Sequence, residues 1–163
     1  MNVNKSKYMA ALLYFISYCN NKYLGVTKLN KLFYYLDFIY YRDNKKSITG
    51  DEYISQKYGP IPSNLTTILD SAKKDGLLQI DEESFSINGE EIKKIKYLTK
   101  EKPDMNVFND KEKELLENIK NEFTSYNTDQ IVLQTHLEAP WAFTNEGEKI
   151  DYELANDIEF FEK

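Results

Sequence analysis

The chain has 163 residues, of which 41% are hydrophobic and 29% are charged, and its net charge is −6. This length predicts a single domain over residues 1–163. The residue patterns predict an α+β fold that is mainly helical, with helices and a small antiparallel sheet in 1–105 and further helices in 106–163. A single cysteine excludes an internal disulfide and suits a reducing compartment, and the apolar runs are far shorter than the ~20 residues of a membrane helix. We therefore expect a cytoplasmic protein that does not enter a membrane.

The charge is distributed unevenly along the chain. Residues 1–75 contain 11 Lys and Arg against 6 Asp and Glu, net +5, whereas residues 76–163 contain 10 against 21, net −11. An acidic C-terminal half repels nucleic-acid phosphates and attracts a cationic partner. The 13 Tyr and 9 Phe suit a core, and also an interface, built from large rings.

Two helices open the chain. The first is predicted over residues 5–20, ending at Asn20-Asn21. The second is predicted from Thr27, as its cap, to Tyr41, and it is apolar around most of its circumference. Its apolar residues are Leu29, Leu32, Phe33, Leu36 and Ile39 on one face, and Tyr34, Phe38 and Tyr41 beside them. Because a helix of this kind is normally enclosed, we expect it to be the centre of the core.

The middle of the chain reads as short strands around one helix. Residues 51–58 predict a strand that Gly59, Pro60 and Pro62 stop, because proline lacks the donor that a strand ladder needs. Ser63 or Asn64 is then expected to cap a helix that ends at Gly76. Further strands follow, joined at Asn88-Gly89 by a hairpin turn. One antiparallel sheet is expected, built from the segments around Tyr53, Leu78, Phe85 and Ile95.

A helix followed directly by a hairpin is typical of a winged-helix segment, which raises the alternative of a transcriptional autoregulator. The candidate recognition helix offers only Lys73 and Lys74, however, and the expected wing is acidic. Its carboxylates are Asp81, Glu82, Glu83, Glu90 and Glu91. Since phosphate contacts dominate nucleic-acid affinity, the charge argues against DNA or RNA as a partner.

The C-terminal part is predicted to be helical. Asn109 and Glu112 have the spacing of a capping box, and Thr128 is expected to cap a shorter helix that Pro140 ends. Residues 151–161 read as an acidic, amphipathic last helix. His136 is expected at the C-terminus of its helix, where positive charge is favoured, and Trp141 is expected to pack against the helices; an exposed contact patch is the alternative for both.

No motif for catalysis or cofactor binding is present in the sequence. There is no P-loop, no G-x-G-x-x-G, no G-x-S-x-G and no H-E-x-x-H, and one histidine with one cysteine cannot make a histidine-rich or thiolate zinc site. We therefore expect no catalytic residue, no cofactor and no metal. An enzyme without a recognisable motif stays open, through a Cys19–His136 dyad or a pair of carboxylates.

The order of three short motifs resembles the Panacea antitoxin-domain family, also called SocA-like or GepA-like proteins. The first motif is K-L-x-K-L-x-Y, carried by Lys28, Leu29, Lys31, Leu32 and Tyr34. The second is K-Y-G-P, carried by Lys57, Tyr58, Gly59 and Pro60, and the third is H-x-x-x-P-W, carried by His136, Pro140 and Trp141. The residues reach across nearly the whole chain in the family's order.

The resemblance implies an antitoxin that neutralises a cognate toxin by direct protein contact. It also implies two variant roles: an adaptor that delivers a bound toxin to a protease, and a phage- or prophage-encoded inhibitor of a host protein. For the motif residues it implies either a structural role or contact with the partner.

Overall fold

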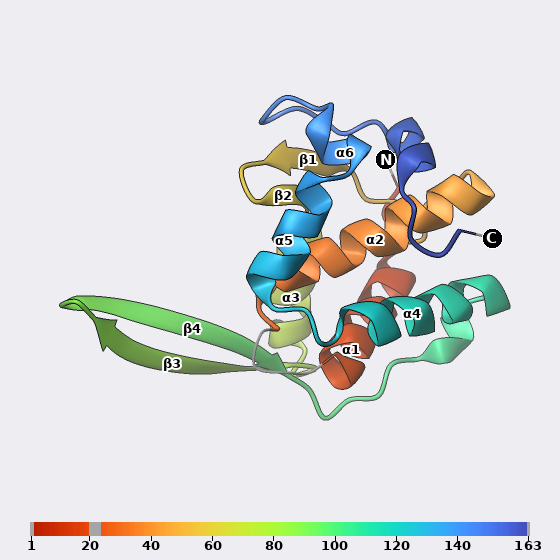
Figure 1. Cartoon of the computed structure of the whole chain (residues 1–163). Helices are drawn as coiled ribbons and strands as arrows, with labels where there is room; N and C mark the ends of the chain where they lie inside the picture. Colours follow the sequence, from red (N-terminus) through yellow and green to blue (C-terminus); the bar gives the residue numbers. More distant parts are fainter. Residues whose placement is uncertain (1, 20–23, 163) are drawn as a thin grey trace.

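The structure is a computed structural model that describes residues 2–19 and 24–162. Helix α2 forms its centre. It spans Val26–Asn44, and both Leu32 and Leu36 are completely buried. Other helices surround it (Figure 1): α1 (Lys5–Tyr18), α3 (Leu65–Lys74), α4 (Asp110–Phe123), α5 (Thr128–His136) and α6 (Ala139–Ala142). The predicted central helix and the predicted α+β class, mainly helical with a small antiparallel β component, are confirmed.

The ends of the first two helices differ in detail from the sequence prediction. Thr27 lies inside α2 rather than at its cap, because the helix begins at Val26 after the extended residue Gly25. At the other end α2 continues past the predicted Tyr41 to Asn44, and Lys45 then adopts the left-handed conformation that ends it. The predicted exit of α1 at Asn20-Asn21 lies outside the described residues.

The segment after α2 folds into a tight hairpin of two strands, β1 (Tyr53–Gln56) and β2 (Gly59–Pro62). The prediction that Gly59, Pro60 and Pro62 stop a strand is therefore wrong, since these residues form β2 itself. Proline is tolerated there because β2 is an edge strand of a two-stranded sheet and has no neighbour on its outer side.

The outer edge of β1 is covered by a C-terminal segment. Ser55 donates its amide to the Glu148 carbonyl over 2.9 Å, and the Gly147 and Ile150 amides donate to the carbonyls of Ser55 and Tyr53 over 2.7 and 2.8 Å. Chain segments roughly ninety residues apart are thus joined at this hairpin, which lies beside α5 and α6 (Figure 1).

A second, separate sheet projects from the body of the molecule (Figure 1). It consists of β3 (Gln79–Ile87) and β4 (Glu90–Leu98), which we call the arm, and every residue of β3 is exposed. Asn88 and Gly89 have φ of 52° and 80° and form the predicted turn. The prediction of one sheet that includes the Tyr53 segment is wrong, because β1 pairs with β2 and is bridged at Ile54 to Lys149, and neither β1 nor β2 pairs with the arm.

The C-terminal elements bring further corrections. The capping box of Asn109 and Glu112 is confirmed at the start of α4, but α5 is capped by Asn127 instead of Thr128. Pro140 lies in the first turn of α6 and does not end α5; this is a favoured place for proline, where its missing amide proton is not needed. The expected last helix is a 3-10 helix, η2 (Tyr152–Asp157). The remaining element is the 3-10 helix η1 (Met105–Val107).

Aromatic rings fill much of the core around α2. Phe38 stacks on Tyr152 with ring centroids 4.3 Å apart, and Tyr35 stacks on Phe123 at 4.4 Å. These contacts attach η2 and α4 to the central helix. In the described part of the chain, no helix has both the length and the apolar character that crossing a membrane requires.

Replacing Leu36 by Ala should lower the free energy of unfolding by about 2–5 kcal/mol, because the side chain is completely buried in α2 and its loss leaves a cavity. Urea unfolding followed by circular dichroism measures the change. Leu133→Ala is the matched control, since that leucine is 62% exposed on α5 and should change stability by at most about 0.5 kcal/mol. Equal losses in the two variants would contradict a core centred on α2.

Candidate functional site

The β1–β2 hairpin is attached to α2 through a buried lysine. The Nζ atom of Lys31 donates a hydrogen bond of 3.0 Å to the carbonyl of Pro60, and the lysine side chain is completely buried. Burial disfavours the ammonium ion and lowers the pKa of Lys31 to about 8. The carbonyl of a residue 29 positions away therefore solvates a charge that α2 carries into the core.

Gly59 allows this close approach for two reasons. Its φ of +108° is a conformation that residues with a side chain rarely adopt. In addition, a Cβ atom there would lie 2.7 Å from Oγ1 of Thr135 and 2.8 Å from Cε of Lys31. The K-Y-G-P motif thus needs glycine because the backbone of β2 touches both α2 and α5.

Two side chains from the H-x-x-x-P-W motif hold the other strand and the turn. Nε1 of Trp141 donates to the Gln56 carbonyl over 2.7 Å, and the His136 ring hydrogen-bonds to the backbone of Lys57. The His136 and Trp141 rings stack on each other, with centroids 3.8 Å apart and planes 18° apart. Because His136 lies on α5 and Trp141 lies on α6, both helices contact the backbone of the hairpin.

These contacts join parts of all three motifs, and we call them the hairpin clamp. Its members are Lys31, Lys57, Gly59, Pro60, His136 and Trp141. His136 lies in the last turn of α5, as predicted, but burial and the nearby charge of Lys31 lower its pKa. The ring therefore acts as a neutral stacking and hydrogen-bonding group rather than as a cation at a helix end.

The other motif residues lie outside the clamp. Nζ of Lys28 donates to the carbonyls of Thr124 and Tyr126, over 2.9 and 2.6 Å, and so ties the start of α2 to the loop between α4 and α5. Burial lowers the pKa of Lys28 to about 8. Leu29 and Leu32 are core residues.

At the tip of the β1–β2 hairpin the second motif reaches the surface. The Tyr58 side chain is 60% exposed, and Nζ of Lys57 lies 5.4 Å from the centre of its ring. Pro140 is buried in the first turn of α6. Among the residues of the three motifs, those of this turn therefore face solvent. Most of the others make contacts within the protein.

Sequence reasoning missed two buried carboxylates, Glu138 and Asp37. Glu138 accepts hydrogen bonds from the hydroxyls of Tyr34 and Tyr35, over 3.0 and 3.2 Å, and burial raises its pKa to about 7. Asp37 of α2 accepts from the amides of Ile48 and Thr49, the Thr49 hydroxyl and the Tyr53 hydroxyl, and burial raises its pKa to about 6. For Asp37 the sequence did contain a signal, because this aspartate interrupts the apolar run of residues 32–41.

The chemistry of these groups is that of structural polar contacts. Each of the two carboxylates is surrounded by donors from tyrosine, threonine or the backbone, which leaves little capacity to bind a substrate. Cys19 interacts with Thr124 and Lys28, whereas His136 lies in the clamp, so the dyad considered from the sequence does not form. Among residues 2–19 and 24–162 no three ligating side chains are grouped as a metal would require.

Comparison with known proteins places the chain in a family. The family model described as "Antitoxin SocA-like, Panacea domain" matches residues 29–142, which is more than half of the chain and includes the whole clamp. The chain belongs to the Panacea domain family of SocA-like antitoxins. No curated protein and no solved structure matched it in the same comparisons. The resemblance read from the three Panacea motifs is thus confirmed at the level of the family.

Gly59→Ala should destabilise this Panacea domain clearly more than Gly76→Ala. Both glycines have positive φ, so both variants lose about 1–2 kcal/mol to backbone strain. Only at position 59 does the new methyl group also collide with Thr135 and Lys31, whereas nothing lies within 4 Å at position 76. Overpacking adds about 1–3 kcal/mol. Thermal and urea unfolding measure the difference; equal losses would show that β2 can move away from α2 at little cost.

The free energy of unfolding of the wild type, minus that of the Glu138→Gln variant, should fall as the pH rises from about 4.5 to about 7. In that range the folded protein keeps a proton on Glu138 that the unfolded chain releases, because burial raises the pKa of the carboxyl from 4.5 to about 7. Stability falls with pH wherever the folded state binds more protons, here by at most about 3 kcal/mol.

Urea unfolding of both proteins across this range checks the pH prediction. Asp37 also has a raised pKa, but it is present in both proteins and its contribution cancels in the difference. A difference in unfolding free energy that does not change with pH, or that changes in the opposite direction, would contradict a protonated Glu138 in the folded state.

Proposed function

We propose that this protein binds a toxic protein and silences it by direct contact in the cytoplasm, without covalent chemistry. The observation that carries the proposal is the Panacea match over residues 29–142, a family described as antitoxin-like. The state of the titrating groups supports it, because Lys31, Asp37 and Glu138 are engaged with protein partners in the core. These are contacts of a binding scaffold rather than a set of groups that converge on a substrate.

Charge favours a protein as the partner over nucleic acid. The arm contains five carboxylates and three lysines between positions 79 and 98, so a duplex approaching it in the manner of a wing would meet net negative charge. A protein interface needs exposed apolar anchors, and the surface offers groups of them in two regions. One region comprises the first hairpin and the C-terminal ends of α5 and α6; the other is the arm. The exposed apolar residues of the first region are Tyr58, Leu133, Leu137 and Phe143, and those of the arm are Ile80, Phe85, Ile87, Ile92 and Ile95.

Titration against the toxin tests the proposal. The probe is the protein encoded by the adjacent reading frame. In a growth assay it is expressed at a fixed level, while the expression level of the Panacea protein is raised stepwise. We expect rescue to saturate near equal amounts, a complex that co-purifies, and a toxin of unchanged intact mass. Because apolar contacts should set the lifetime of the complex, its affinity should fall only moderately between low and high salt.

Other results would point to other functions. Rescue at far less than one copy per toxin, with a modified toxin and no stable complex, would indicate an enzyme and defeat the proposal. Loss of toxin that requires a cellular protease, after a complex has formed, would indicate an adaptor that delivers the toxin for degradation; steric silencing alone should leave the toxin level unchanged.

A further inference from the structure

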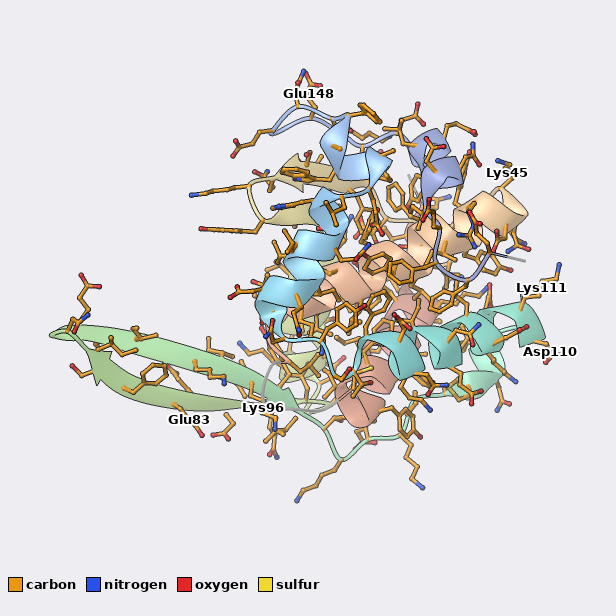
Figure 2. The ribbon with its side chains drawn as sticks, viewed as in Figure 1. Lys45, Glu83, Lys96, Asp110, Lys111 and Glu148 are labelled. Carbon is orange, nitrogen blue, oxygen red and sulfur yellow. The ribbon has the colours of Figure 1, made fainter. Side chains whose placement is uncertain are left out.

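The arm is long, exposed on both faces, and supported by the body only near its base. A two-stranded hairpin standing alone is marginally stable in water, and nine-residue strands are longer than a simple connection between α3 and η1 requires. Five large apolar side chains are nevertheless exposed along it: Ile80, Phe85, Ile87, Ile92 and Ile95. Figure 2 shows arm side chains, Glu83 among them, that project where no other element covers them.

The strand register gathers three of these side chains on one face of the tip. Phe85 is directly opposite Ile92, and Ile87 follows Phe85 two residues later on the same face. We call Phe85, Ile87 and Ile92 the tip patch; their exposed fractions are 43%, 49% and 38%. An apolar face of this kind is normally covered, and nothing else in the described structure covers it.

The other face of the tip is polar. Ser84 is opposite Lys93, and Ser86 is opposite Glu91, at the two rungs that flank the Phe85–Ile92 rung. The alternation of one apolar and one polar face is the pattern of a strand pair that packs on a surface through one side. The tip therefore has one apolar face suited to contact with a partner and one polar face suited to solvent.

Charge at the tip indicates what the patch can contact. The lysines farther down the arm are matched within it, since Lys94 and Lys96 lie opposite Glu83 and Asp81. Glu90, in contrast, lies on the same face as the tip patch, opposite Ile87. The contact face thus combines apolar side chains with an acidic group that has no lysine across the ladder, which complements an apolar surface bordered by Lys or Arg.

We propose that the tip patch is the docking surface for the toxin, and that it receives an apolar surface of the toxin flanked by basic side chains. This inference rests on the proposed function and assigns its contact to the arm. A second copy of this chain fits less well, because two tips packed face to face about a two-fold axis would bring two copies of the acidic Glu90 to one interface.

The first test removes the patch and keeps the strands. In the double variant Phe85→Thr with Ile92→Thr, β-branched threonine retains the strand preference while the apolar contact area is lost. The matched control is Ser84→Thr with Ser86→Thr, the two uncharged positions that flank Phe85 on the opposite face. With the purified product of the adjacent reading frame as probe, we expect Kd to rise about 30-fold or more in the first variant, and about threefold or less in the control.

The second test changes charge on one face at a time. Glu90→Lys and Glu91→Lys alter the net charge equally at adjacent positions, but only residue 90 shares a face with the tip patch. We expect Glu90→Lys to weaken the complex about tenfold or more at low salt, with a smaller effect at high salt, and Glu91→Lys to weaken it far less. Equal effects of the two substitutions would mean that only general attraction acts, and would overturn the assigned face.

The outcomes separate this inference from the proposed function. If the wild-type protein forms no complex with the probe, the proposed function fails and the inference fails with it. If the wild type binds at equal amounts and the Phe85/Ile92 variant binds as tightly, only the inference is overturned, and the contact lies elsewhere. If light scattering shows that this variant changes the oligomeric state of the isolated protein, the patch serves self-association, which also overturns the inference.

Discussion

The structure depends on charged groups that α2 carries into the core. Lys28, Lys31 and Asp37 are buried on this one helix, and a buried charge without partners would cost several kcal/mol. Each finds its partners in a remote segment: Lys28 in the loop after α4, Lys31 in β2, and Asp37 in residues 48–53. The need to satisfy these groups therefore specifies where the loop and the hairpin lie against the helix, which apolar packing alone would specify less sharply.

The central helix could be predicted from the sequence, whereas its polar contacts could not. Apolar residues at a spacing of three and four positions, such as Leu29, Leu32 and Leu36, have few alternatives to a buried face. A lysine in the same stretch is normally solvated, and no linear pattern shows that Lys31 meets a carbonyl 29 residues away. The motifs could therefore be recognised as a set, while the clamp that joins them needed the three-dimensional structure.

The errors in the strand prediction have a related cause. Pro60 and Pro62 disfavour a central strand, but an edge strand needs no donor on its outer side, and whether a strand lies at an edge is decided by tertiary structure. In the same way, the Asn88-Gly89 turn predicts a hairpin from local geometry, yet nothing local decides whether that hairpin joins β1 and β2 in one sheet. Local features were predictable here, and the assembly of separate hairpins was not.

The clamp and the tip patch differ in what surrounds their side chains. Substitutions in the clamp disturb buried charges and close packing, so they act on stability. The side chains of the tip patch are exposed on the arm and do not belong to the core, so we expect substitutions there to leave the core intact and to affect what the arm contacts. If the arm carries the contact with the toxin, partner choice can change through Phe85, Ile92 and Glu90 without a change in fold, because the residues that recognise the partner are separate from those that hold the domain together.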